Sequence, residues 1–315
     1  MVRNKTYMGT LVAVLSLGLA QGSLYALIAL GYTMVYGIIE LINFAHGDVF
    51  MVGAFLSFLV LQAVFGPAVS TLGGVALVAA VVLALVVAML GCGILGVVIE
   101  RLAYRPLRSA PRLAPLVTAI GVSFILENGM QVWQGGGTKP FPPLIPRTNF
   151  YVAGTPVSTS VFIVVISALV LMVGLDTLVN RTRIGRAMRA TAQDPEAAMM
   201  MGVDVNRIIS ITFFIGSALA GAAGVVYGMY INNIDWHIGF GAGLKAFTAA
   251  VLGGIGNIRG AMLGGLAVGL LEALVSQMGN GNGIQWAEAA VFSVLILVLV
   301  FRPTGLLGAQ VVEKA

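Results

Sequence analysis

The chain has 315 residues, of which 59% are hydrophobic and only 9% are charged, and its formal net charge is +5. Soluble domains carry about 25% charged residues, so this composition excludes a water-soluble surface and indicates a polytopic membrane protein. The single cysteine excludes a disulfide framework and a cysteine-based metal site. The basic residues gather at the ends of apolar runs, which is the pattern that orients a chain in a lipid bilayer. We therefore expect no nucleic-acid partner.

Apolar runs long enough to cross a bilayer follow one another along the chain. We expect them at about 8–30, 32–61, 73–99, 114–133, 161–179, 208–231, 261–278 and 285–301. The first run has no clear cleavage site, so we expect it to be retained as a span. The segment 245–257 is too short and too rich in glycine for a plain span. The sequence thus predicts an all-α polytopic protein with about eight or nine membrane segments, including broken or re-entrant helices, in a single domain, 1–315.

The arginines predict the orientation of the chain. The loops 101–112 and 181–207 are rich in arginine and are predicted to be cytoplasmic, whereas 134–160 and 279–283 are predicted to be external. The side of the N-terminus stays open at this point. Its basic residues favour the inside, but two plain spans before residue 62 would place it outside.

The loop 181–207 holds eight of the chain's 29 charged residues and contains a predicted short helix, 195–201. Asp194 is a good N-cap, and Pro195 suits the first helical position. Glu196 adds negative charge at the positive end of the helix dipole, and Gly202 can end the helix in a left-handed conformation. A short helix rich in Ala and Met outside the membrane is suited to docking on another protein.

Two interpretations of this loop remain open. Its arginines could serve only to fix topology. Alternatively, Glu196, Ala197 and Ala198, followed by Gly202, resemble the first part of the EAA loop of ABC importer membrane subunits, which is the helix that sits in a groove of the ATPase. The later part of that pattern, Ile-x-Leu-Pro, is missing here.

Ionisable residues at membrane depth are costly and are candidates for function. A polar cluster interrupts the second apolar run and gives candidates for the translocation path: Glu40, Asn43, His46 and Asp48. The alternative is that Glu40 and Asp48 lie at the ends of two shorter spans. The other acids in apolar runs are expected to make one interhelical hydrogen bond each: Glu127, Glu272 and Glu288.

A second irregular segment gives four more candidates for the path: Gly253, Gly254, Gly256 and Asn257. Backbone can unwind inside a membrane where protein or a water-filled cavity satisfies its polar groups, and broken helices often mark a substrate path. Close helix packing through the glycines is the alternative. The chain contains no Gly-Lys pair and so no P-loop. Transport energy would come from a partner subunit or from an ion gradient.

Four motifs resemble one family, the permeases of branched-chain amino-acid ABC importers, and within it the H-type subunit. They are GSLYALIALGYTMVYGIIELINFAHGDVFMVGAF (22–55), ERLAYRPLR (100–108), RIGRAMRATAQDPEAAMMMG (183–202) and KAFTAAVLGGIGNIRGAMLGG (245–265). The resemblance implies a bacterial inner-membrane complex with a second, dissimilar permease, two cytoplasmic ATPase subunits and a periplasmic amino-acid-binding protein. It assigns the EAA role to Glu196, Ala197, Ala198 and Gly202.

The expected function is that of a non-catalytic pore subunit, which passes Leu, Ile or Val from the binding protein into the cytoplasm. It would have no catalytic residue, metal or cofactor of its own, because the partner ATPases bind the ATP. Import of urea or short amides by the same family is an alternative, and so is an ion-coupled secondary transporter. A membrane-embedded enzyme would need a convergent polar site, for which the sequence offers no candidate.

Overall fold

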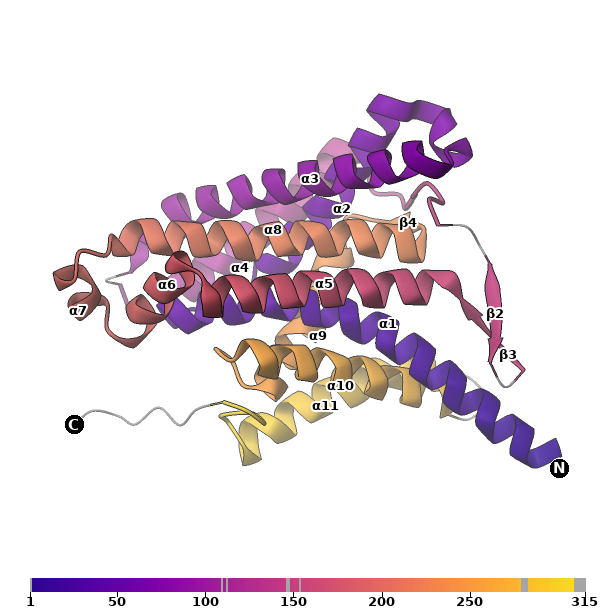
Figure 1. The fold of residues 1–315 in the computed structure, drawn as a ribbon. Coiled ribbons are helices and arrows are strands. Elements are labelled where there is room, and N and C mark those ends of the chain that lie inside the picture. The colour runs from indigo at the N-terminus through magenta and orange to yellow at the C-terminus, as the bar shows by residue number, and fades with distance from the viewer. Residues whose placement is uncertain are drawn as a thin grey trace.

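The computed structural model describes residues 2–108, 110–111, 113–145, 148–152, 154–278 and 283–308. Within these residues, eight helices are long and apolar enough to cross a membrane. They lie side by side in one elongated bundle (Figure 1). They are α1 (Val2–Ile39), α2 (His46–Phe65), α3 (Gly74–Ile99), α4 (Leu113–Gln134), α5 (Thr159–Arg181), α8 (Val205–Ile231), α10 (Ile258–Gln277) and α11 (Ile284–Phe301). The predicted all-α polytopic fold is confirmed.

The boundaries of the first two spans differ from the prediction. α1 continues without interruption through Gly31 to Ile39, and the chain leaves helical geometry at 40–45 before α2 begins. Gly31 serves close packing here. A Cβ at this position would overlap the ring of His46 and would lie 3.1 Å from the carbonyl oxygen of Gly216 on α8. The glycine therefore brings three helices together and does not end one.

A shorter apolar helix, α9 (Ile238–Gly253), follows α8. It contains residues 245–253 of the glycine-rich segment that was predicted to be no plain span. Gly239 and Gly243 lie against the backbone of Gly47, so these glycines allow α9 and α2 to approach closely. α9 ends at Gly254, whose φ is +102°, in the region that glycine favours.

Short elements mark the two ends of the bundle. At one end, β2 (Asn149–Val152) and β3 (Thr155–Ser158) form a hairpin, and nearby β1 (Lys139–Pro140) pairs with β4 (Asn233–Ile234). At the opposite end lie α6 (Arg183–Gln193) and α7 (Pro195–Met200) (Figure 1). We name these the hairpin end and the coupling end. The hairpin end contains the loop predicted to be external, and the coupling end contains one loop predicted to be cytoplasmic.

The first residues of α1 lie at the hairpin end. Figure 1 shows the N-terminus beside β2 and β3, and a Cβ on Gly9 would lie 3.0 Å from Thr155 of β3. Two helices precede residue 66, so the structure supports the alternative in which the N-terminus shares a side with 134–160. Part of the turn 279–283, predicted to be on that side too, lies outside the described residues, as do Arg112 and Arg147.

Candidate functional site

α7 is built as its sequence predicts. The Asp194 carboxylate accepts hydrogen bonds from the backbone N–H groups of Glu196 and Ala197, both at 3.0 Å, and Pro195 occupies the first turn. Gly202 follows the helix with a φ of +84°. The predicted caps are therefore confirmed, because they depend only on neighbours in the sequence.

α7 presents a methionine surface at the coupling end. Met199, Met200 and Met201 have exposed fractions of 54%, 88% and 85%, whereas Ala198 is buried. Methionine side chains adapt to a partner's shape. Exposed apolar patches of this kind mark interaction sites, so this surface can receive another protein.

α6 precedes α7, and sequence reasoning missed it. The Thr182 side chain caps α6 by accepting from the backbone N–H of Gly185 at 3.1 Å, and the Arg189 guanidinium donates to the carbonyl oxygen of Val179 at the end of α5. Met188 and Thr191 lie on the buried face of α6. The three-residue spacing of the arginines, which keeps them on one face, was the signal for this amphipathic helix.

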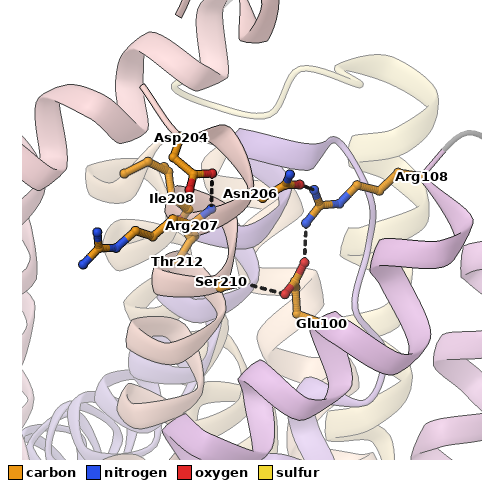
Figure 2. A network of polar contacts seen from close by, with 8 residues as sticks. All are labelled: Glu100, Arg108, Asp204, Asn206, Arg207, Ile208, Ser210 and Thr212. Atoms are coloured by element: carbon orange, nitrogen blue, oxygen red, sulfur yellow. Dashed lines mark hydrogen bonds and ion pairs between the residues drawn. The ribbon is translucent and has the colours of Figure 1, made fainter. Parts of the chain in front are cut away.

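A polar network joins the start of α8 to the end of α3 (Figure 2). Glu100 is fully buried in a π-helical turn, Glu100–Tyr104, that continues α3. Its carboxylate accepts from the Ser210 hydroxyl at 2.7 Å and pairs with the Arg108 guanidinium, which also donates to Asn206 at 2.7 Å. We name Glu100, Arg108, Asn206 and Ser210 the α3–α8 clamp. It holds the first turns of α8, which directly follow α7.

Two opposing effects act on the Arg108 guanidinium of the clamp. Burial lowers the pKa of the Arg108 guanidinium below its usual value, and the Glu100 carboxylate opposes that shift. Arginine remains protonated in proteins, so the Arg108 guanidinium keeps its positive charge beside Glu100. Figure 2 shows the Arg207 side chain pointing away from the clamp, while its backbone N–H donates to Asp204, the N-cap of α8, at 3.0 Å.

The predicted cluster at 40–48 is divided by the structure. Glu40 ends α1 with a φ of +53° and is exposed, whereas Asn43, His46 and Asp48 are buried. The Tyr104 hydroxyl donates to the Asn43 side chain at 3.1 Å. Residues 40–45 are not helical, so Glu40, Asn43 and His46 do not lie on one continuous helix. Gly47 belongs to the first turn of α2.

His46 and Asp48 lie in that first turn, inside the bundle. The Ser123 hydroxyl of α4 donates to the Asp48 carboxylate. Both acids lie at the ends of spans, as the alternative predicts, because Glu40 follows α1 and Asp48 lies in the first turn of α2, but the Asp48 side chain is buried against α4.

The second predicted segment, 253–257, forms the tight turn between α9 and α10. The Asn257 side chain accepts from the backbone N–H of Gly260 at 3.0 Å and donates to the carbonyl oxygen of Leu307 at 2.8 Å. Gly253 and Gly254 serve close packing, because a Cβ on either would overlap the backbone of Gly260 or Gly308, respectively. Close packing through the glycines therefore applies to Gly253 and Gly254, and a role of the segment in the translocation path stays a prediction.

One cavity brings part of the two predicted segments together. It has a volume of about 730 Å³, lies at the coupling end, and is lined by Glu40, Gly256 and Asn257. Its wall includes an ion pair between Arg259 and Asp176, with 3.4 Å between Nε and Oδ1. Asn43, His46 and Asp48 do not line it.

The three single acids have different surroundings. Glu127 pairs with His237, at the start of α9. Glu272 accepts from the Tyr25 hydroxyl at 2.7 Å and from the Lys245 ammonium at 2.8 Å, so the expectation of a single hydrogen bond was wrong for this residue. Glu288 lies 3.1 Å from the same ammonium. Within the described ranges, no group of three or more His, Cys, Asp or Glu side chains is arranged to hold a metal ion.

Comparisons with known proteins agree with the motifs. The family model described as the permease component of branched-chain amino acid transport systems matches residues 14–301. The high-affinity branched-chain amino acid transport system permease protein BraD of Pseudomonas aeruginosa is 44% identical, covering 94% of this chain and 95% of its own. The corresponding protein LivH of Escherichia coli is 43% identical, with the same coverage of both chains. A chain in the solved structure of PsaBC from Streptococcus pneumoniae in complex with Fab is 12% identical, with a TM-score of 0.47 over 96% of this chain and 97% of that one. The chain belongs to the family of permease components of branched-chain amino acid transport systems.

Proposed function

We propose that this chain is a pore subunit of an ATP-driven importer that carries Leu, Ile and Val across the inner membrane of a bacterium. The observation that carries the proposal is the alignment of 94% of the chain with permeases named for high-affinity branched-chain amino acid transport. A periplasmic binding protein delivers the amino acid, and a second, dissimilar permease completes the path.

Two cytoplasmic ATPase subunits supply the energy, and one of them holds α7. The exposed methionines of α7 support this assignment, as does the capping that keeps so short a helix formed without a partner. Asp194, Pro195, Glu196, Ala197, Ala198 and Gly202 shape the docked helix. This chain binds no ATP and forms no covalent intermediate in the cycle.

Closure of the ATPase dimer moves α7, and two rigid connections carry the movement into the membrane. α6 links α7 to α5, because Arg189 donates to the last turn of that helix. The α3–α8 clamp links the residues after α7 to α3. The helices then move as rigid bodies, since their backbone hydrogen bonds are satisfied within each helix.

The cavity at the coupling end is the inner mouth of the path. Its polar lining, with Glu40, Asn257 and the Asp176–Arg259 ion pair, offers an amino acid both hydrogen-bond donors and acceptors as it leaves the apolar bundle. The buried polar groups at Asn43, His46 and Asp48 lie deeper, where they line the path only in another conformation of the helices.

Transport by the reconstituted complex tests the proposal. The chain is co-purified with its partner permease and ATPases, placed in proteoliposomes with the binding protein, and supplied with ATP on the α7 side. We expect leucine uptake that requires ATP and continues when a protonophore dissipates the proton gradient. Gradient-driven uptake without ATPase subunits would instead establish a secondary transporter. ATP-driven uptake of urea or short amides without leucine would establish the other importer.

A further inference from the structure

A second, smaller cavity lies in the half of the bundle nearer the hairpin end. It has a volume of about 270 Å³ and lies between α1, α2, α8, α9 and α10. Its place along the bundle follows from Tyr230, in the last turn of α8, which lines it. Ligand pockets span about 300–1,000 Å³ for drug-sized molecules, so this cavity suits a ligand the size of a single amino acid.

The cavity is lined by both apolar and charged side chains. Leu24, Ile28 and Phe50 supply aliphatic and aromatic surface. The lining also includes the Lys245 ammonium of α9, which lies 2.8 Å from the Glu272 carboxylate of α10, and the side chains of the two residues are only 13% and 10% exposed. An apolar surface together with one positive and one negative group matches the chemistry of an apolar amino acid.

Lys245 is in contact with two carboxylates, one more than its single charge can balance. The Lys245 ammonium contacts both Glu272 and the exposed Glu288, the latter at 3.1 Å. The Tyr25 hydroxyl donates to the other oxygen of Glu272 at 2.7 Å and so holds that carboxylate in place. Lys245 can therefore release Glu272 to an incoming cation and still keep Glu288 as its own counter-charge.

Helix packing alone gives no reason for such a group of charges. Ionisable side chains at membrane depth are costly, and a buried ion pair is often no more stabilising than apolar residues of similar size. A binding role gives the pair a function, because each member would meet a complementary group of a zwitterion.

We propose that this cavity is a binding subsite for a zwitterionic amino acid with an apolar side chain, on the route from the hairpin end into the bundle. The Glu272 carboxylate accepts from the α-ammonium, and the Lys245 ammonium donates to the α-carboxylate. The side chain lies against Leu24, Ile28 and Phe50. The inference rests on the proposed function, and it adds the group that recognises the substrate within the permease. Urea carries neither charge, so the site disfavours it.

Thiol protection tests the site without the binding protein, whose own specificity would hide that of the permease. Gly241 lines the cavity, and a Cβ there would meet open space. The assembled complex carries Gly241→Cys in a Cys92→Ser background and is treated with a small methanethiosulfonate reagent. The probes are leucine, leucinamide, which lacks the carboxylate, and 4-methylpentanoate, which lacks the ammonium. Gly137→Cys, in the loop at the hairpin end with similar open space, is the matched control.

We expect leucine to protect Gly241→Cys and to leave Gly137→Cys unprotected. For the same protection of Gly241→Cys, each analogue should need a concentration about tenfold higher than leucine, or more. This is the factor expected when a hydrogen bond to a charged group is lost. Adding Lys245→Met should make leucine and leucinamide equally effective, and adding Glu272→Gln should do the same for leucine and 4-methylpentanoate. Glu288→Gln should preserve the order of the three ligands.

Two results would overturn the subsite. One is an absence of protection by leucine at any concentration. The other is equal protection by all three ligands in the complex that retains Lys245 and Glu272, which would leave the ion pair a structural role only. This comparison needs neither charge variant, so it does not depend on whether those variants assemble. ATP-driven leucine uptake by the unsubstituted complex is measured in parallel. If uptake occurs and protection fails, the subsite is wrong and the importer stands, whereas an absence of uptake counts against the proposed function itself.

Discussion

Gly202 sets the path of the chain where it leaves α7. Its φ of +84° lies in the left-handed region, which costs other L-residues about 1–2 kcal/mol. No other described part of the chain lies within 4 Å of the position of a Cβ on this residue. A substitution here therefore strains the backbone without a clash inside the subunit, and any further effect of bulk comes from a docked partner.

We expect Gly202→Val to uncouple ATP hydrolysis from transport while the complex stays assembled. The β-branched side chain disfavours the left-handed conformation, so the chain after α7 shifts relative to the ATPase groove. The measurement is binding-protein-stimulated ATP hydrolysis and leucine uptake in the purified complex, with bound ATPase quantified. Gly202→Asn is the control, because asparagine tolerates this conformation, and it should retain most activity. Normal coupling in Gly202→Val would leave 194–202 with a topogenic role only.

The residues that could be predicted from the sequence are those whose partners are close in the chain. Asp194 and Gly202 act within one turn of α7, so their types and spacing were enough. The partners of Glu100 and Lys245 lie on other helices, since Glu100 meets Ser210 and Lys245 meets Glu272. Only the packing of the helices brings these pairs together, so neither pair could be predicted from the sequence.

At the scale of elements, the α3–α8 clamp joins the end of α3 to the first turns of α8. Glu100 is fully buried, and the Arg108 side chain is 23% exposed. Removing one member of such a pair leaves the other charge without its partner, which costs more than replacing both with apolar residues. The free energy of unfolding should therefore depend on which member is removed.

Arg108→Met should destabilise the complex more than Ser210→Ala, because it leaves the buried Glu100 carboxylate without its cation. A buried hydrogen bond to a charged group contributes about 1.5–3 kcal/mol, so a clear fall in Tm is expected. Thermal unfolding of the purified complex measures it. Arg105→Met, an exposed arginine of the same loop, should leave Tm unchanged, and Glu100→Leu combined with Arg108→Leu should recover much of the loss. Equal Tm values for Arg108→Met and Arg105→Met would show that the clamp does not stabilise the fold.

Most of the later helices were predictable from their apolar length, but the sequence alone left open whether the first spans are separated near Gly31 or at the polar cluster 40–48. Hydropathy continues through Gly31 and beyond it, and the choice between a break at Gly31 and one at 40–45 depends on packing. The His46 ring packs against Gly31, and α1 stays helical at this residue. The same reasoning applies to α9, because its Gly239 and Gly243 pack against Gly47, which is far away in the sequence.

At the scale of the whole molecule, orientation depends on how the two ends of the bundle divide the positive charges. The coupling end carries most of the arginines of 101–112 and 181–207, whereas Arg3 and Lys5 begin α1 at the hairpin end. α1 has 38 residues, a length of about 57 Å at 1.5 Å per residue, and a bilayer core is about 30 Å thick. Its first turns therefore extend past the core, at the end of the bundle opposite the larger arginine cluster.

Cysteine labelling should accordingly place the start of α1 outside the cell. Single cysteines are introduced as Met8→Cys, Gly136→Cys and Arg186→Cys in a Cys92→Ser background, in which the serine hydroxyl can replace the thiol that donates to Val49. Met8 is exposed, Gly136 belongs to the loop at the hairpin end, and Arg186 lies on α6. An impermeant thiol reagent added to intact cells should label the first two, and Arg186→Cys should react only after the membrane is opened. Labelling of Met8→Cys together with Arg186→Cys, and apart from Gly136→Cys, would mean that α1 enters the membrane from the cytoplasm and that its packing against β3 is wrong.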